Sequence, residues 1–339
     1  MPVSSLPSRT GVGEMGAEAY HFLTLLKESG IKIWQILPMN PVGYGNSPYQ
    51  PYSSCAGDEL YISLDTLYEE GLLKERPEGF HEYATKVDYD AVRLHKEPYL
   101  REAFQTFLTS GGCETKDYQE FADQSWVYEY GAFRALKKAN GGCCWNEWRQ
   151  EDKMWPDART DLAPELETEV QYHMFLQYVF FSQWMKLKEK ANAYDIQIMG
   201  DVPFYVGVDS VDVWAAKDNF LLDTDGRPIF IAGVPPDYFS ATGQRWGNPI
   251  YNWEYLKENK KRLQRIAEGV IAAQGYDYPA AVELGVRYIP QKTYGDITFP
   301  AGNYEALNIT IGSGQGENWW CVLFPPLCLL DEGTAPLSG

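Results

Sequence analysis

Residues 19–37 read AYHFLTLLKESGIKIWQIL, and this stretch decides the fold class. Phe22, Leu23 and Leu26 lie at helical spacing, and Gly30 is a residue type at which helices end. The apolar, β-branched run at residues 31–37 is typical of a strand. The stretch therefore predicts a helix that leads directly into a strand.

A second unit of the same kind occurs later in the chain. Met174, Tyr178, Phe181 and Met185 are predicted to share one face of a helix, and the run IQIMGDVP at residues 196–203 follows it. Repeated helix-to-strand units are typical of α/β folds with parallel strands. We therefore predict an α/β fold.

The remaining segments differ in pattern. Residues 66–165 carry helical patches and Trp residues, and we interpret them as a helical insertion. After Trp253 the spacing predicts an amphipathic helix that ends at Gly275, built on Leu263, Ile266, Ala267, Val270 and Ile271. A half-buried strand with Leu307, Ile309 and Ile311 is expected next, followed by the compact apolar run at residues 319–328.

Composition narrows the classes of partner. The chain has 339 residues and a formal net charge of −18, which repels phosphate backbones and anionic headgroups, so we expect no nucleic-acid and no membrane partner. Its 24 Tyr and 11 Trp suit a neutral sugar, whose apolar faces stack on aromatic rings. Core packing combined with solubility is the alternative explanation of the same numbers.

The sequence shows no targeting signal and no metal-binding pattern. The first residues, MPVSSLPS, lack the pattern of a signal peptide, and no run has the length of a membrane span, so a cytoplasmic location is expected. The six Cys show no C-x-x-C spacing and the four His are widely separated. We therefore expect no metal and no cofactor.

The segment PVGYGNSPYQPY at residues 41–52 is the first candidate for a binding site. It follows the first predicted strand, and loops after parallel strands are where α/β folds bind ligands. Tyr44, Tyr49 and Tyr52 offer flat faces, whereas Ser47 and Gln50 offer hydrogen bonds. A purely structural turn is the alternative.

Two further segments carry candidate groups. Asp201 is placed at the carboxyl end of the second predicted strand, where it is either a ligand contact or a helix cap or turn former. Residues 232–249 read AGVPPDYFSATGQRWGNP, a Gly- and Pro-rich loop whose aromatic residues would be costly in a plain connector. The candidates in it are Asp237, Tyr238, Phe239, Gln244 and Trp246.

These three segments, in this order, resemble the amylomaltases of glycoside hydrolase family 77, and the likeness covers about residues 3–257. The resemblance implies a TIM (β/α)8 barrel, here partial, that cuts α-1,4-glucans, holds the glucosyl chain covalently and passes it to another maltooligosaccharide. Ala241 departs from the acidic residue frequent in relatives. The substrate-binding residues implied by the resemblance are Ser47, Tyr49, Asp201, Asp237, Tyr238, Phe239, Gln244 and Trp246.

The catalytic residues of that family have no counterpart in the sequence. Retaining transfer needs two carboxyl groups about 5 to 5.5 Å apart. The resemblance places the nucleophile in a motif Arg-Ile-Asp-His-Phe-Arg-Gly shortly after Trp253, and no such motif occurs in the 339 residues. We therefore expect a truncated, catalytically silent 4-α-glucanotransferase, or alternatively an α-glucan binder without turnover.

Residues from about 258 to 339 resemble another family, the stage II sporulation protein R. The likeness rests on the runs QGYDYP at 274–279, YGDITFPAG at 294–302 and NWWCVLFPPLC at 318–328. It implies a signalling role in sporulation. In an exported setting Cys321 and Cys328 would be able to form a disulfide; the alternative is a small α+β tail with two buried thiols. The expected domains are thus 1–257 and 258–339, joined either in the gene itself or by an assembly error.

Overall fold

The computed structural model describes residues 1–80, 86–201, 203, 205–234, 241–273, 275–289, 291–294, 297–299 and 301–315. The chain divides into two compact units, Met1–Ile250 and Tyr251–Gly339. The domain boundary expected between residues 257 and 258 stays a prediction, as does the insertion at residues 66–165.

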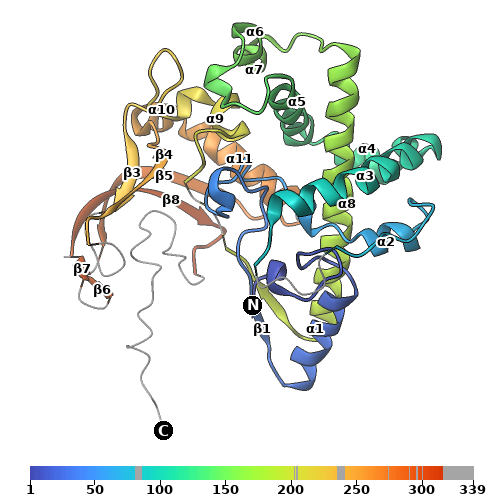
Figure 1. The fold of residues 1–339 in the computed structure, drawn as a ribbon. Helices are drawn as coiled ribbons and strands as arrows, with labels where there is room; N and C mark the ends of the chain where they lie inside the picture. Colours follow the sequence, from blue (N-terminus) through green and yellow to red (C-terminus); the bar gives the residue numbers. More distant parts are fainter. Residues whose placement is uncertain are drawn as a thin grey trace. The chain divides into compact units, whose positions relative to one another are not determined.

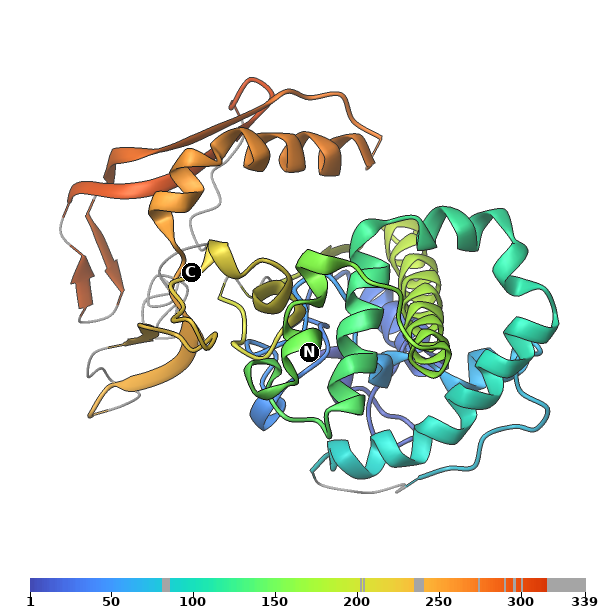
Figure 2. The same ribbon diagram turned by 90° about the horizontal axis from the view of Figure 1, so that it is seen from above.

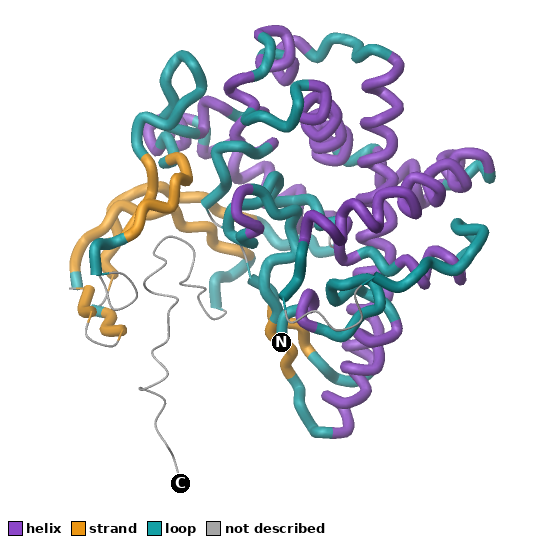
Figure 3. The backbone as a smooth tube through the Cα atoms, in the orientation of Figure 1, coloured by secondary structure: helices purple, strands orange, loops and turns teal. Residues whose placement is uncertain are grey.

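Most described residues of the first unit lie in helices and loops (Figures 1 and 3). Its α-helices are α1 (Ala17–Glu28), α2 (Leu64–Glu69), α3 (Tyr89–Thr109), α4 (Lys116–Ala122), α5 (Ser125–Ala139), α6 (Gln150–Lys153), α7 (Trp155–Ala158), α8 (Pro164–Ala193) and α9 (Val211–Ala215). Its strands are β1 (Ile33–Gln35), β2 (Gln197–Met199), β3 (Ile231–Val234) and β4 (Gln244–Pro249). Short 3-10 turns occur at η1 (Val3–Ser5), η2 (Tyr44–Asn46), η3 (Glu59–Tyr61), η4 (Gly112–Glu114), η5 (Trp145–Glu147) and η6 (Lys217–Asn219).

Both predicted helix-to-strand units are present. Helix α1 leads into β1 and α8 leads into β2, and the two strands pair in parallel with Trp34 opposite Ile198. The strands are shorter than the sequence predicts because ladder hydrogen bonds need a partner, and β1 and β2 face each other over three residues each. The parallel arrangement that the sequence predicts is confirmed for this pair.

Helix α8 is the centre of the helical part. Figure 2 looks nearly along it, and α1, α3, α4 and α5 all contact it. Its most deeply buried apolar side chains include Tyr172, Phe175, Leu176 and Leu187, whereas Met185 is exposed. The predicted face is therefore wrong at Met185, because a helix with neighbours on several sides is apolar over much of its circumference and its spacing selects no single face.

Two glutamines of α8 hold the segment before α2. Gln177 accepts a hydrogen bond from the N–H of Gly57 at 2.7 Å and donates one to its carbonyl at 2.9 Å. Gln183 does the same for Ser63, at 2.7 and 3.2 Å. A Cβ at position 57 would lie 2.2 Å from the Phe180 ring, so this close approach requires glycine.

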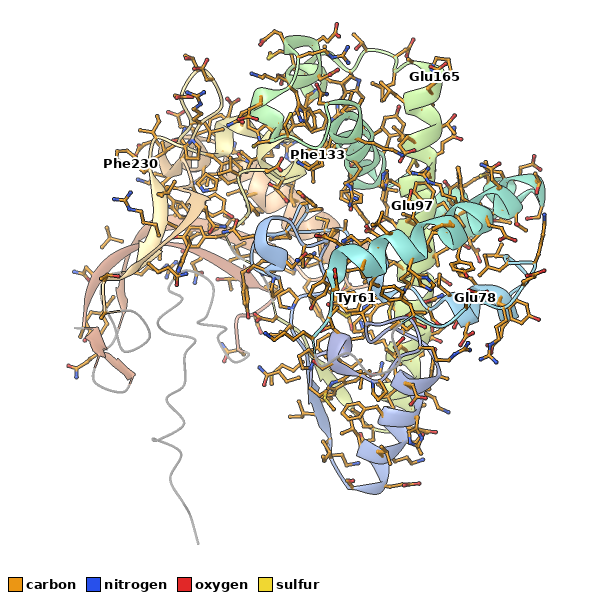
Figure 4. All side chains as sticks on the ribbon, viewed as in Figure 1. Tyr61, Glu78, Glu97, Phe133, Glu165 and Phe230 are labelled. Atoms are coloured by element: carbon orange, nitrogen blue, oxygen red, sulfur yellow. The ribbon has the colours of Figure 1, made fainter. Side chains whose placement is uncertain are left out.

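Much of the aromatic content packs inside the first unit. Phe133, labelled on α5 in Figure 4, lies with its ring centroid 5.4 Å from Trp148 and 5.7 Å from Trp214. Trp155 stacks on Trp214 at 5.7 Å, and Trp145 is also buried. For these tryptophans the core-packing explanation of the composition is correct.

The second unit contains α10 (Trp253–Glu258), α11 (Lys260–Ala273), β5 (Ala280–Ile289), β6 (Lys292–Tyr294), β7 (Ile297–Phe299) and β8 (Gly302–Ile311). Strand β5 pairs antiparallel with β8, and β6 with β7. The predicted amphipathic helix is α11 and the predicted strand is β8. Ile309 and Ile311 are exposed, however, and the apolar run at residues 319–328 lies outside the described residues.

Candidate functional site

Residues 41–52, named here the Tyr49 loop, form a closed turn after β1. Val42 and Pro51 make an antiparallel bridge, and the N–H of Gly43 donates to the carbonyl of Gln50 at 3.0 Å. A Cβ at position 43 would lie 2.7 Å from that carbonyl oxygen, so the turn requires glycine there. The loop thereby presents Tyr49 at its tip.

Ser47 shapes the tip of the Tyr49 loop. Its hydroxyl accepts a hydrogen bond from the N–H of Tyr49 at 3.3 Å, and its carbonyl accepts one from the N–H of Gln50 at 3.1 Å. Ser and Thr hydroxyls commonly stabilise turns in this way. The Tyr49 side chain is exposed, as a ring that stacks on a ligand must be.

Tyr49 and Asp201 meet across two loops. Asp201 follows β2, which ends at Met199, so the carboxylate lies at the carboxyl end of a parallel strand as predicted. The Tyr49 hydroxyl donates to Oδ2 of Asp201 at 2.8 Å. Because β1 and β2 are adjacent and parallel, the loops that follow them begin at the same edge.

Gln50 joins a third segment to this pair. Its Nε2 donates to the carbonyl of Trp246 at 2.8 Å and to Oδ1 of Asn248 at 2.7 Å. Asn248 is buried and its Nδ2 donates to the carbonyl of Val206 at 2.9 Å. The Tyr49 loop, β4 and the loop after β2 are therefore linked through two amide side chains.

Aromatic rings border the same link. The rings of Tyr205 and Trp246 are 6.2 Å apart in an edge-to-face arrangement, a separation at which aromatic rings attract. Gln244 lies opposite Val234 at the outer end of the β3–β4 hairpin, with its side chain exposed. The loop that joins the two strands carries the predicted residues Asp237, Tyr238 and Phe239, which lie outside the described residues.

The base of the Tyr49 loop rests on a buried ionic network. Oδ2 of Asp58 accepts from the N–H of Val42 at 3.1 Å and from Nη2 of Arg93 at 2.8 Å. Arg93 also bonds Glu59 at 2.6 Å, and Arg134 lies 3.6 Å from the same carboxylate. Burial alone would raise the pKa of Glu59, but Arg93 and Arg134 outweigh it and lower that pKa to about 2.

Tyr52 anchors the loop on α5. The charged ends of Lys137 and Arg134 lie over its ring, 5.0 and 5.6 Å from the centroid, within the usual range of cation–π contacts. Its carbonyl accepts a hydrogen bond from the N–H of Val211 at 2.9 Å. The tyrosine is therefore a structural member of the loop, unlike the exposed Tyr49.

Two members of this arrangement, Asn248 and Tyr205, were not predicted from the sequence. Gln50 was predicted to be a hydrogen-bonding residue, but no partner was predicted for it. The partners of Gln50 lie about 200 residues away, at separations of 196 and 198 positions. Local periodicity carries no information about such contacts.

The described residues were compared with the patterns of membrane spans and of metal sites. None of the helices in the described part of the chain combines the length and the apolarity needed to cross a membrane. Within the same ranges, no cluster of three or more His, Cys, Asp or Glu side chains is arranged to hold a metal ion.

Solved structures of amylomaltases resemble the chain. The amylomaltase from Streptococcus agalactiae, solved in complex with acarbose, superposes with a TM-score of 0.71 at 35% identity and covers 93% of this chain and 63% of its own. The amylomaltase from Corynebacterium glutamicum superposes with a TM-score of 0.56 at 16% identity, over 75% of this chain and 36% of its own. The latter likeness concerns the fold alone.

A second family matches the end of the chain. Residues 244–334 match the family model described as stage II sporulation protein R. This match overlaps by some twenty residues with the match of the first part of the chain, which ends at residue 264.

The first part of the chain matches one family throughout. Residues 1–264 match the family model described as 4-alpha-glucanotransferase. The 4-alpha-glucanotransferase of Thermus thermophilus is 44% identical over 278 residues, and that of Synechocystis sp. 45% over 267. These alignments cover 78% and 75% of this chain but 54% and 52% of the relatives, so the chain spans about half their length. By this similarity, the chain belongs to the 4-alpha-glucanotransferase family.

Proposed function

We propose that the surface formed by Tyr49, Asp201 and Trp246 binds α-1,4-glucans and maltooligosaccharides. The observation that carries the proposal is the link through Gln50 and Asn248, which joins the Tyr49 loop, β4 and the loop after β2 and brings an exposed tyrosine, a carboxylate and a tryptophan to one place. Sugar rings stack on aromatic faces, while carboxylate and amide groups bond their hydroxyls. The amylomaltase from Streptococcus agalactiae, solved in complex with acarbose, supports this choice of substrate class.

The proposal extends to the residues of the third loop. Ser47 supports the tip of the Tyr49 loop, and Gln244 is the first residue of β4, directly after the loop that connects β3 and β4. Both are included in the proposed glucan site. Asp237, Tyr238 and Phe239 follow from the family resemblance as the part that folds over the glucan. In the same proposal, the parallel pair β1–β2 belongs to a partial TIM barrel and the protein acts in the cytoplasm, without a nucleic-acid or membrane partner.

We further propose that these 339 residues bind glucan without transferring it. Glycosyl transfer with retention needs a nucleophile and an acid/base carboxyl group about 5 to 5.5 Å apart. The sequence contains no Arg-Ile-Asp-His-Phe-Arg-Gly motif, in which the family carries its nucleophile. Asp201 serves here to hold a sugar hydroxyl and the Tyr49 hydroxyl.

Calorimetric titration with maltoheptaose tests the binding part of the proposal. Maltoheptaose is expected to release heat, whereas cellohexaose, its β-1,4-linked counterpart, is not. Tyr49→Ala should remove the signal and Tyr68→Ala, which alters an exposed tyrosine on α2, should leave it unchanged. Equal heats for both ligands, or none, would exclude the site.

Incubation with maltotriose tests the catalytic part separately. Neither glucose nor longer maltodextrins should form above the level of a blank without the protein. Product formation would show that another carboxylate of this chain serves as the nucleophile, and it would leave the binding proposal intact.

A sporulation role of the second unit is the competing function. It is favoured by one observation, the match of residues 244–334 to the stage II sporulation protein R model. The test is expression of this chain in a spore-forming strain that lacks its own protein R. Recovery of spore formation would establish signalling, and no recovery would leave glucan binding as the function.

A further inference from the structure

One face of the β5–β8 hairpin is mainly apolar. Val282 lies opposite Ile309 and Ala280 opposite Ile311, and residues directly opposite in a ladder share a face while neighbours along a strand alternate. This face, named here the apolar face, carries Ala280, Val282, Leu284, Val286, Tyr288, Leu307, Ile309 and Ile311, with Asn303 and Glu305 at the end farthest from Ile311. The opposite face, named here the polar face, carries Glu283, Arg287, Asn308 and Thr310 together with Ala281, Gly285, Ile289, Gly302, Tyr304 and Ala306.

The described residues cover only part of this apolar face. Helix α11 contacts β5 and runs along the hairpin (Figures 1 and 2), and Ala280 and Val282 are buried. Four further large side chains of the face are between 46% and 69% exposed, namely Val286, Tyr288, Ile309 and Ile311, whereas Leu284 and Leu307 are half-buried. A cluster of exposed apolar side chains of this kind marks an interaction surface.

The chain itself supplies a segment of matching character. Residues 318–330, NWWCVLFPPLCLL, contain no charged residue, and they begin a few positions after β8 ends at Ile311. Trp319 lies eight positions after Ile311, a length of chain that spans at most about 28 Å when extended. That reach is sufficient to bring the segment to Ile309, Ile311 and Val282.

We propose that residues 319–330 bind the apolar face of the β5–β8 hairpin within the same molecule. The match to a single family model over residues 244–334 supports the proposal, because it includes α11, the hairpin and the whole of this segment. Because the segment is tethered to the hairpin, its effective concentration at the apolar face is in the millimolar range. A second copy of the chain lacks that advantage and is repelled by a net charge of −18.

The proposal is independent of the glucan site and predicts a specific pattern of cross-links. Cys321 and Cys328 lie in the segment, so a cysteine placed on the hairpin can be joined to them by a short bismaleimide after reduction. Ile309→Cys places the thiol on the apolar face, and Thr310→Cys places it on the polar face, one position closer to the segment along the chain. If the length of the connecting chain alone decided the yield, Thr310→Cys, the control, would therefore form more cross-link than Ile309→Cys.

The expected result is at least about tenfold more intramolecular cross-link to residue 321 or 328 from position 309 than from position 310, measured by peptide mass spectrometry. If Ile309→Cys disturbs folding, a second pair of variants repeats the comparison farther along the hairpin. In this pair Val286→Cys lies on the apolar face, and Arg287→Cys is its control on the polar face. Equal yields from the two faces would overturn the proposal. Cross-links between molecules in excess would also overturn it, in favour of a second copy as the occupant.

Discussion

The hydroxyl of Tyr49 donates a hydrogen bond to the carboxylate of Asp201 at 2.8 Å, although 152 positions separate the two residues. Tyr49→Phe removes this bond and keeps the ring, so the loops lose a contact that orders the site while stacking is retained. We expect maltoheptaose affinity to fall about fivefold, equivalent to about 1 kcal/mol for an exposed hydrogen bond. Calorimetric titration measures the change.

Two controls accompany this substitution. Tyr68→Phe removes a hydroxyl from an exposed tyrosine on α2 and should leave the affinity unchanged. Asp201→Asn combined with Tyr49→Phe should cost less than the sum of the single changes, because both disrupt the same pair. Strict additivity would show that Tyr49 and Asp201 contribute to binding independently.

Gln50 is expected to position the β3–β4 hairpin relative to Tyr49. Gln50→Leu leaves the Trp246 carbonyl and Asn248 Oδ1 without the donor that now serves both, at a cost of about 1 to 3 kcal/mol. The free energy of unfolding should fall by that amount in urea denaturation. Maltoheptaose affinity should fall as well, because Trp246 is no longer held beside the Tyr49 loop.

A matched exchange separates this effect from a general loss of polarity. Gln119→Leu on α4 replaces an exposed glutamine and should change neither quantity. An unchanged affinity of Gln50→Leu, despite a lower unfolding free energy, would mean that the residue stabilises the loops without positioning Trp246 for glucan.

Lys96 illustrates the cost of an incomplete buried ion pair. Its Nζ donates to Glu14 at 2.9 Å and to the carbonyls of Leu60 and Ile62 at 2.7 and 2.6 Å. Lys96→Met leaves a buried carboxylate without its counter-charge, so the unfolding free energy should drop by about 3 to 5 kcal/mol. Lys186→Met, which breaks an exposed pair with Glu70, should cost about 1 kcal/mol or less.

Glu59 should make the stability of the first unit depend on acidity. Arg93 and Arg134 overcome the effect of burial and lower the pKa of Glu59 from 4.5 to about 2. A carboxyl group with a lowered pKa in the folded state contributes stability that is complete above pH 4.5 and is lost as the pH falls toward 2. The full contribution is on the order of 3 kcal/mol.

The measurement is the unfolding free energy between pH 5 and pH 3, compared with that of Glu59→Gln. The difference between the two proteins should shrink as the pH falls, because the wild-type carboxylate takes up a proton on unfolding. Asp157→Asn, which removes an exposed carboxylate, is the control for the loss of one negative charge. A constant difference for Glu59→Gln would assign its effect to shape or hydrogen bonding rather than charge.

The elements of this fold were easier to predict than their partners. The helix at α1, the strand at β1 and the parallel pairing with β2 follow from spacing and from the repeat of one unit. The strand lengths and the buried face of α8 did not follow, because they depend on which neighbours arrive from distant parts of the chain. Met185 has apolar character but is left exposed for that reason.

The same distinction holds for the candidate site. Tyr49 and Asp201 were identified by their position after strands, which is a property of the local sequence. The amide link through Gln50 and Asn248 requires knowledge of a contact between residues 198 positions apart. Side-chain hydrogen bonds of this range have no periodic signature, so only the structure reveals that the three loops are joined.

The glutamine pairs of α8 have a consequence for biosynthesis. Gln177 and Gln183 each hold a residue made 120 positions earlier, Gly57 and Ser63. At the usual rate of about 5 to 20 residues per second, a ribosome needs roughly 6 to 24 s to add that length. During this interval the backbone groups of both residues lack their final partners. The segment before α2 must therefore wait on the growing chain, bound to water or to a chaperone, until α8 emerges.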